Sequence, residues 1–196
     1  MPKMMTPDDE KKQLRKEAAK RRKDAYNAMA DAPRRIASHH HLLSERYDTT
    51  AVAAYWPIKT EIDPLPLLDA LRSTGGTSCL PVTPEEGKPL TFHQWENGSP
   101  LADGPYNTKE PFATSPIIMP TLILAPLLAF DADCWRLGYG GGFYDRTLAA
   151  LEQVGHQVDV VGIAFDESFV HKVPTGPYDR QLSAILTPSA LRLPQS

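Results

Sequence analysis

The sequence predicts an α/β fold with a mostly parallel sheet that helices cover on both faces. Apolar runs of strand length alternate with helical patterns from about residue 50 to residue 190. The run 121–125 (TLILA) lacks polar alternation, as is typical of a strand buried on both faces. The chain of 196 residues suits one domain, and no internal repeat is visible, so residues 1–196 are interpreted as a single domain.

Basic helices are expected before this core, over about residues 7–46. Thr6 is suited to cap a helix, and Pro7 suits its first position. The helix has only a narrow apolar stripe, which predicts a place on the surface of the domain. The stripe consists of Leu14, Ala18, Ala25 and Met29. Pro33 interrupts this helix, and a second one is expected over 34–46.

The second predicted helix contains three consecutive histidines. Neighbouring residues on a helix point in different directions. We therefore interpret His39, His40 and His41 as solvated surface and not as a metal site.

The core itself is expected to alternate short strands with two helices. Strands are predicted at 51–56, 77–82, 90–95, 121–125, 158–165 and 183–186, and helices at about 64–72 and 142–151. The proline-rich connection 97–120 is long for a compact domain, which indicates a functional or disordered segment.

Composition favours a cytoplasmic protein. The two cysteines, Cys79 and Cys134, have no metal-ligand spacing and do not indicate a disulfide framework. No apolar run is long enough for a transmembrane helix, and the N-terminus lacks the pattern of a secretory signal. The net charge of −3 is unevenly placed, because residues 1–46 hold 12 of the 21 basic and 7 of the 24 acidic residues. That basic segment suits a polyphosphate, nucleic acid or an acidic partner, or is a solvated helix face.

The segment that carries chemistry is the glycine-rich run 136–146 (RLGYGGGFYDR). Glycines just before a helix leave backbone N–H groups free to bind an anion, and the helix dipole adds to the attraction. Arg136 and Arg146 can add charge-assisted bonds to phosphate oxygens. Asp145 offers the hard oxygen ligand that Mg2+ on a nucleotide requires.

Two common nucleotide motifs do not fit this run. A Walker A loop needs Gly-Lys-Ser/Thr, which does not occur here. A dinucleotide fingerprint needs a third glycine where Phe143 or Asp145 stands. The run therefore indicates a different type of phosphate site.

The run, together with the preceding 126–131 (PLLAFD), resembles the signature of the 5-formyltetrahydrofolate cyclo-ligase family, also called 5,10-methenyltetrahydrofolate synthetases. The resemblance extends over most of the chain in the same order. It includes 11–15 (KKQLR), 55–61 (YWPIKTE), 104–111 (GPYNTKEP), and 173–187.

The resemblance implies a three-layer α/β/α fold and an ATP- and Mg2+-dependent ligase. The implied reaction converts 5-formyltetrahydrofolate, with or without a polyglutamate tail, to 5,10-methenyltetrahydrofolate with release of ADP and phosphate. The formyl oxygen attacks the γ-phosphate, and N10 then closes the ring as phosphate leaves. We expect a monomer with no nucleic-acid or membrane partner.

The resemblance also implies roles for individual residues. The implied ATP-binding set is Lys11, Arg15, Arg136, Gly138, Tyr139, Gly140, Gly141, Gly142, Phe143 and Tyr144. The implied catalytic set is Arg136, Tyr144 and Arg146, and the implied Mg2+ ligands are Asp145 and Asp179. The implied folate-binding set is Trp56, Glu61, Tyr139, Gly140, Gly141, Gly142 and Phe143.

For some of these residues a purely structural role is an alternative. Asp179 also suits a turn-capping acid, and Trp56 a core residue at the end of a strand. Tyr106 and Glu110 either contact ligand or only order their loop, and Trp95 is assigned to structure.

The chain departs from the family pattern at three places. Gly141 stands where many members have lysine, so one phosphate charge must be met elsewhere, for example by Arg146. Cys134-Trp135 replaces a small turn containing glycine. Asn107 stands where glycine is frequent, and asparagine tolerates the same left-handed backbone.

Two other classes of function compete with the ligase. The absent loop lysine would also suit a regulatory protein that binds ATP without turnover. The basic first helix would suit a nucleic-acid-binding module, although the acidic remainder of the chain argues against it.

Overall fold

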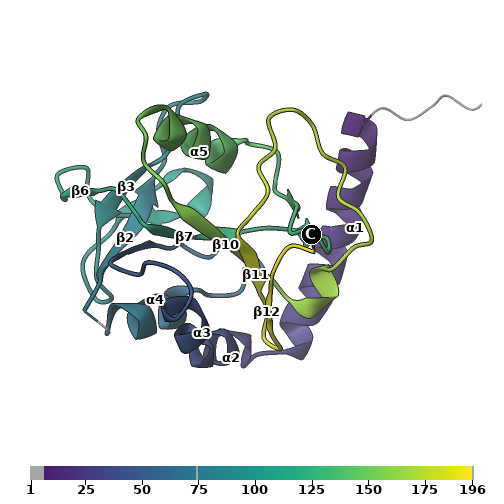
Figure 1. Cartoon of the computed structure of the whole chain (residues 1–196), viewed down its shortest axis with the longest axis horizontal. Helices are drawn as coiled ribbons and strands as arrows, with labels where there is room; N and C mark the ends of the chain where they lie inside the picture. The colour runs from purple at the N-terminus through teal and green to yellow at the C-terminus, as the bar shows by residue number, and fades with distance from the viewer. Residues whose placement is uncertain (1–6, 74, 196) are drawn as a thin grey trace, which may run out of the picture.

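An eight-stranded mixed sheet forms the centre of the computed structural model, which describes residues 7–73 and 75–195 (Figure 1). The strand order is β12-β11-β10-β7-β1-β2-β3-β6. The strands are β1 (Ala51–Ala53), β2 (Thr77–Val82), β3 (Thr91–Gln94), β6 (Ile117–Ile118), β7 (Leu122–Pro126), β10 (Asp159–Ile163), β11 (Ala184–Leu186) and β12 (Leu191–Arg192).

The centre of the sheet is parallel, which confirms the predicted fold class. The five central strands pair in parallel with one another, in the order β11, β10, β7, β1 and β2. The outer strands β12, β3 and β6 pair in antiparallel fashion. Strands β6 and β12 were not predicted, because each has only two residues and therefore no readable alternation.

Helices cover both faces of the sheet (Figure 1). Helices α2 (Ala32–Ser38), α3 (His40–Ser44) and α4 (Leu65–Arg72) lie on one face, and α5 (Phe143–Gln153) lies on the other. In β7, Leu122 and Leu124 belong to the core under α4, whereas Ile123 and Ala125 belong to the core under α5. This two-sided burial explains why the strand is apolar at every position.

Helix α1 (Pro7–Ala28) lies outside these layers, beside the hairpin of β8 (Ala129–Phe130) and β9 (Arg136–Leu137) (Figure 1). Its narrow apolar stripe is confirmed, because Ala18 and Ala25 are buried and Leu14 and Met29 are half-buried. Ala18 packs in a small core with residues of the hairpin and with Val173. The predicted cap, Thr6, lies outside the described residues.

The second predicted helix is wrong in detail, because α2 and α3 are separate and meet at His39. The rings of His39 and His40 bond to the carbonyls of Pro188 and Ala37 at 3.2 and 3.1 Å. Both histidines are therefore half-buried, and only His41 is exposed as predicted. Within the described part of the chain, no group of three or more His, Cys, Asp or Glu residues is arranged to hold a metal ion.

The proline-rich connection 97–120 is ordered by short pairings. It contains β4 (Ala102–Asp103), β5 (Lys109–Glu110) and a 3-10 turn, η1 (Pro105–Asn107). Asn107 has φ of +62°, as expected for a residue that replaces glycine. Glu110 is buried and accepts a bond from Thr108 at 3.3 Å, which favours a role in ordering the loop.

Both cysteines are free and buried, in agreement with the absence of a predicted disulfide. Burial raises the pKa of the Cys79 thiol to about 12 and that of Cys134 to about 11. None of the described helices is both long enough and apolar enough to cross a membrane.

We expect neither thiol to react with iodoacetamide in the native protein at mildly alkaline pH. The pH then lies below the raised pKa of each thiol, so the reactive thiolate is scarce. Burial also blocks access of the reagent. Mass spectrometry of native and denatured samples checks this: both cysteines should be labelled only after denaturation. Rapid labelling of the native protein would contradict the packing described for these positions.

Candidate active site

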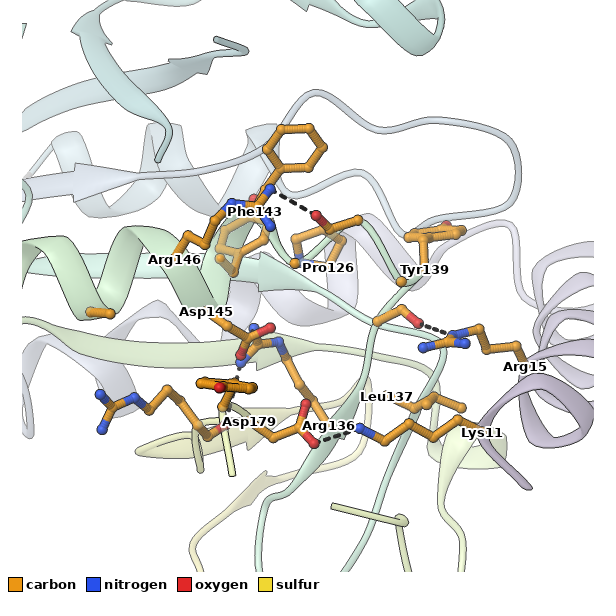
Figure 2. Close-up of a pocket in the computed structure, with 18 of the residues that line it drawn as sticks. Lys11, Arg15, Pro126, Arg136, Leu137, Tyr139, Phe143, Asp145, Arg146 and Asp179 are labelled. Atoms are coloured by element: carbon orange, nitrogen blue, oxygen red, sulfur yellow. Dashed lines mark hydrogen bonds and ion pairs between the residues drawn. The ribbon is translucent and has the colours of Figure 1, made fainter. Parts of the chain in front are cut away.

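A cleft of about 530 Å³ lies at the carboxyl end of β7, where Pro126 forms part of its wall (Figure 2). In parallel α/β sheets, ligands generally bind at this end of the strands. The cleft is bounded by one face of α1, the glycine-rich segment 138–142, the first turn of α5 and the segment 177–180.

The glycine-rich segment connects β9 to α5 and needs the backbone freedom of glycine at two places. Gly140 has φ of +100°, and Gly142 has φ of +65° and is the N-cap residue of α5. Because its N-cap residue is a glycine, this end of α5 has no side-chain cap of its own. The first N–H groups of the helix therefore lack intrahelical acceptors beside the cleft, as predicted for an anion site.

Two cations of α1 reach the cleft (Figure 2). Arg15 donates from Nε to the carbonyl of Gly138 at 3.0 Å. Lys11 lies one turn earlier, and its Nζ is 2.5 Å from the carboxylate of Asp179. The predicted shared face of Lys11 and Arg15 is therefore directed at the glycine-rich segment and at the segment carrying Asp179.

A second ion pair joins Arg136 to Asp145 at 2.8 Å. The Arg136 side chain is only 6% exposed, and its guanidinium lies 5.9 Å from the centre of the Tyr144 ring. Burial raises the pKa of the Tyr144 phenol, so this ring remains neutral. Tyr144 and Asp145 together fix the guanidinium at the wall of the cleft.

Arg146 folds back beneath the glycine-rich segment. It donates to the carbonyl of Gly141 at 2.8 Å, and its guanidinium lies 5.1 Å from the centre of the Phe143 ring. Its Nε is buried and finds no acceptor among the described residues. An unpaired buried donor is costly, so this arginine suits an additional anionic partner.

Glu61 is buried and reaches the cleft only through Tyr139. The Tyr139 hydroxyl donates to Glu61 at 2.7 Å, and the Ile58 backbone N–H donates at 2.8 Å. Burial raises the pKa of Glu61, against the opposing effects of these bonds and of Arg22. Tyr139 as a residue is 41% exposed and lines the wall of the cleft.

The structure brings most of the predicted site residues together. Lys11, Arg15, the segment 136–146 and Asp179 all line one cleft, although they come from separate parts of the chain. Glu61 and Trp56 do not line it. Trp56 is half-buried and packs edge to face against Trp95, with ring centres 6.3 Å apart.

Some residues at the site were not predicted. Pro177, Tyr178 and Arg180 line the cleft beside Asp179; the family resemblance covers their segment, 173–187, but gave these three residues no role. Arg22 is buried and contacts both Tyr139 and Glu61. Its spacing of seven residues from Arg15 puts both on one face of α1, so the sequence indicates which face Arg22 occupies but not its partners.

Comparisons with known proteins identify relatives of this chain. Residues 7–188 match the model of the 5-formyltetrahydrofolate cyclo-ligase family. The 5-formyltetrahydrofolate cyclo-ligase of Escherichia coli K12 is 34% identical over 143 residues, which cover 70% of this chain and 78% of that protein. The enzyme of the same name from Mycolicibacterium smegmatis is 33% identical over 145 residues, or 70% and 73% of the two chains.

Solved structures of two synthetases share the fold of this chain. The 5,10-methenyltetrahydrofolate synthetase of Aquifex aeolicus superposes with a TM-score of 0.77 at 25% identity, covering 95% of this chain and 93% of the other. The synthetase of Mycoplasma pneumoniae, at 22% identity, has a TM-score of 0.69 over 90% and 97% of the chains and supports the fold alone.

We expect Gly140→Ala to weaken ATP binding roughly 10-fold, because a side chain at this positive φ strains the backbone. The added Cβ would also lie 3.3 Å from the Arg15 guanidinium. Gly138→Ala is the matched control, since a Cβ there meets no atom within 4 Å. Calorimetric titration of both variants measures the affinities. Equal affinities in the two variants would show that the conformation of Gly140 does not matter.

Proposed function

The chain belongs to the 5-formyltetrahydrofolate cyclo-ligase family, and we propose that the cleft binds ATP beside the folate and catalyses their reaction. The activity is the ATP-dependent conversion of 5-formyltetrahydrofolate to 5,10-methenyltetrahydrofolate, with release of ADP and phosphate. The observation that carries the assignment of this site is the convergence of four cationic side chains on the glycine-rich N-terminus of α5.

The triphosphate is proposed to lie along the glycine-rich segment. The cations Lys11, Arg15, Arg136 and Arg146 line the cleft together with residues 138–142 and the start of α5. Backbone N–H groups and the helix dipole favour negative charge at this end of the helix. Tyr139, Phe143 and Tyr144 complete the proposed ATP site along the same wall.

Asp145 and Asp179 are the proposed Mg2+ ligands. Both are carboxylates that line the cleft, and hard oxygen ligands of this type suit Mg2+. Two protein carboxylates leave further coordination positions for phosphate oxygens and water, as is usual for Mg2+ that accompanies a nucleotide. When bound, the ion would neutralise phosphate charge. The ion pairs with Arg136 and Lys11 hold the carboxylates in place.

The reaction needs orientation and charge neutralisation more than a protein nucleophile. The formyl oxygen forms a bond to the γ-phosphorus, and the bond to ADP breaks. N10 then attacks the activated formyl carbon and loses its proton, and the bond between that carbon and the phosphorylated oxygen breaks, so that phosphate leaves with the former formyl oxygen. We assign Arg136 and Arg146 to stabilising charge on the transferred phosphoryl group, and Tyr144 to holding the Arg136 guanidinium.

The folate is proposed to bind next to Tyr139, whose hydroxyl links the cleft to the buried Glu61, the proposed recognition acid. Gly140, Gly141, Gly142 and Phe143 line the adjoining wall of the cleft. Trp56 stays a prediction, and its packing against Trp95 favours a structural role.

We further propose a cytoplasmic monomer with residues 1–196 as one domain, acting on folates with or without a polyglutamate tail. Two free, buried thiols are consistent with a reducing compartment. The cations Lys11, Arg15 and Arg22 of α1 are directed at the glycine-rich segment and its neighbours, which supports a nucleotide partner over a nucleic acid.

The absorbance of methenyl-folate formed from 5-formyltetrahydrofolate, MgATP and the purified protein tests the function directly. We expect Asp145→Asn to lower kcat about 100-fold or more, because a proposed Mg2+ ligand and the partner of Arg136 are lost together. Asp133→Asn, on an exposed turn outside the cleft, should retain normal activity. Near-normal turnover of Asp145→Asn would refute the metal role. ATP binding by the wild type without colour formation would instead favour the regulatory alternative.

Arg146 is expected to supply the charge that many family members place on a loop lysine. Arg146→Met should lower kcat/KM roughly 10- to 100-fold, because a charge-assisted contact to phosphate is lost. Adding Gly141→Lys to that variant should restore part of the loss, since Gly141 lies where the lysine would stand. Steady-state kinetics of the single and double variants checks both effects. An unaffected Arg146→Met variant would show that the phosphate charge is met elsewhere.

A further inference from the structure

A buried arginine of α1 lies behind the cleft and joins the proposed folate acid to the glycine-rich segment. Arg22 is 4% exposed, and its Nε donates to the Thr60 hydroxyl at 3.1 Å. Its Nη1 donates to the Tyr139 hydroxyl and lies 3.8 Å from the Glu61 carboxylate. The guanidinium also lies 5.3 Å from the centre of the Tyr139 ring.

Burying a guanidinium is costly unless its charge and donors are paired. Glu61 supplies the compensating charge and is itself 6% exposed. Packing alone would be satisfied by an apolar side chain at this position of α1. The ion pair between Arg22 and Glu61 instead fixes the direction of the Glu61 carboxylate, and the bond from Arg22 fixes the direction of the Tyr139 hydroxyl.

Tyr139 connects this buried group to the cleft. It stands between two glycines, so the neighbouring residues have no side chains that could hold it in place. Its hydroxyl is bound by Arg22 and Glu61, while Arg15 holds the adjacent Gly138 carbonyl at 3.0 Å. Helix α1 therefore holds two successive residues of the glycine-rich segment, Gly138 and Tyr139, through two arginines that lie about two turns apart on one of its faces.

We propose that Arg22 is a positioning residue for the folate. Arg22 acts through Glu61 and Tyr139. It orients the Glu61 carboxylate that recognises the folate, and it fixes the position of this carboxylate relative to the nucleotide-binding segment. Arg22 does not itself line the cleft and does not take part in the chemistry. The inference rests on the proposed function, and goes beyond it by assigning a role to a residue outside the cleft.

The protonation of Glu61 provides a separate measurement of the positioning role of Arg22. The groups facing Glu61 are Arg22 from α1, Tyr139 from the glycine-rich segment, Tyr144 from α5, Tyr55 after β1, and Lys59 from its own loop. Lys59 is exposed, so Arg22 is the buried cation of this set. Burial raises the pKa of Glu61 and Arg22 opposes that rise. Loss of Arg22 should raise the pKa further, so that the carboxylate is protonated at higher pH.

The test measures KM for each substrate and the pH profile of kcat/KM in the full-length protein. We expect Arg22→Met to raise KM for 5-formyltetrahydrofolate roughly 10-fold, with a smaller change in KM for MgATP. The acid limb of the profile should move to higher pH. Arg22→Lys retains the charge and should partly restore both values, although one ammonium cannot match the fork of donors.

Two further variants control for folding. Tyr139→Phe removes only a hydroxyl and should raise KM for the folate in the same direction by a smaller factor. Arg21→Met is the matched control, because Arg21 is the adjacent arginine and donates to the Phe169 carbonyl at the surface at 3.3 Å. It should leave both KM values and the pH profile unchanged.

A purely structural Arg22 would behave differently. A lower melting temperature and less active enzyme, with unchanged KM and an unchanged acid limb in both Arg22→Met and Tyr139→Phe, would overturn the inference. A wild-type protein that forms no methenyl-folate would instead refute the proposed function itself. The two failures are therefore distinguishable.

Discussion

The glycine-rich segment 138–142 must be held in place by other parts of the chain, and the rest of the site depends on this constraint. Its glycines expose backbone N–H groups to an anion, but they provide no side chains to fix the loop. Helix α1 supplies the missing contacts through Arg15 and Arg22, and α5 supplies Arg146 from the other side. The long surface helix is thus part of the site, although it contributes little to the main core.

Charges in the cleft are already paired with one another. Lys11 is paired with Asp179 and Arg136 with Asp145, so two of the four proposed cationic phosphate contacts are joined to a proposed metal ligand. This arrangement keeps four charged side chains oriented at a partly buried surface without large electrostatic cost. A triphosphate is negatively charged and its Mg2+ is positively charged. The triphosphate can therefore replace the carboxylates as the partner of Lys11 and Arg136, and Mg2+ can replace these cations as the partner of the carboxylates.

The sheet determines where these groups meet. The buried strand β7 ends at Pro126 in the wall of the cleft, and the hairpin β8–β9 leads from there to the glycine-rich segment. Residues 173–180 return to the same place after β10 and bring Asp179 to Lys11. A mostly parallel sheet with crossover helices brings such distant segments to one edge, whereas a purely local motif would not.

The sequence by itself determined the fold class and the buried strands, and it located the glycine-rich run that lines the cleft. Each of these depends on local features, such as the unbroken apolar pattern of 121–125 or the glycines before α5. The break at His39, the two-residue strands and the ring contacts of Trp56 are not encoded by such patterns. Only the tertiary structure decided that Arg22 lies against Glu61 and Tyr139, because their sequence separations are 39 and 117 residues. Contacts of this kind arise when α1 docks on the hairpin, and no periodicity within one segment reports them.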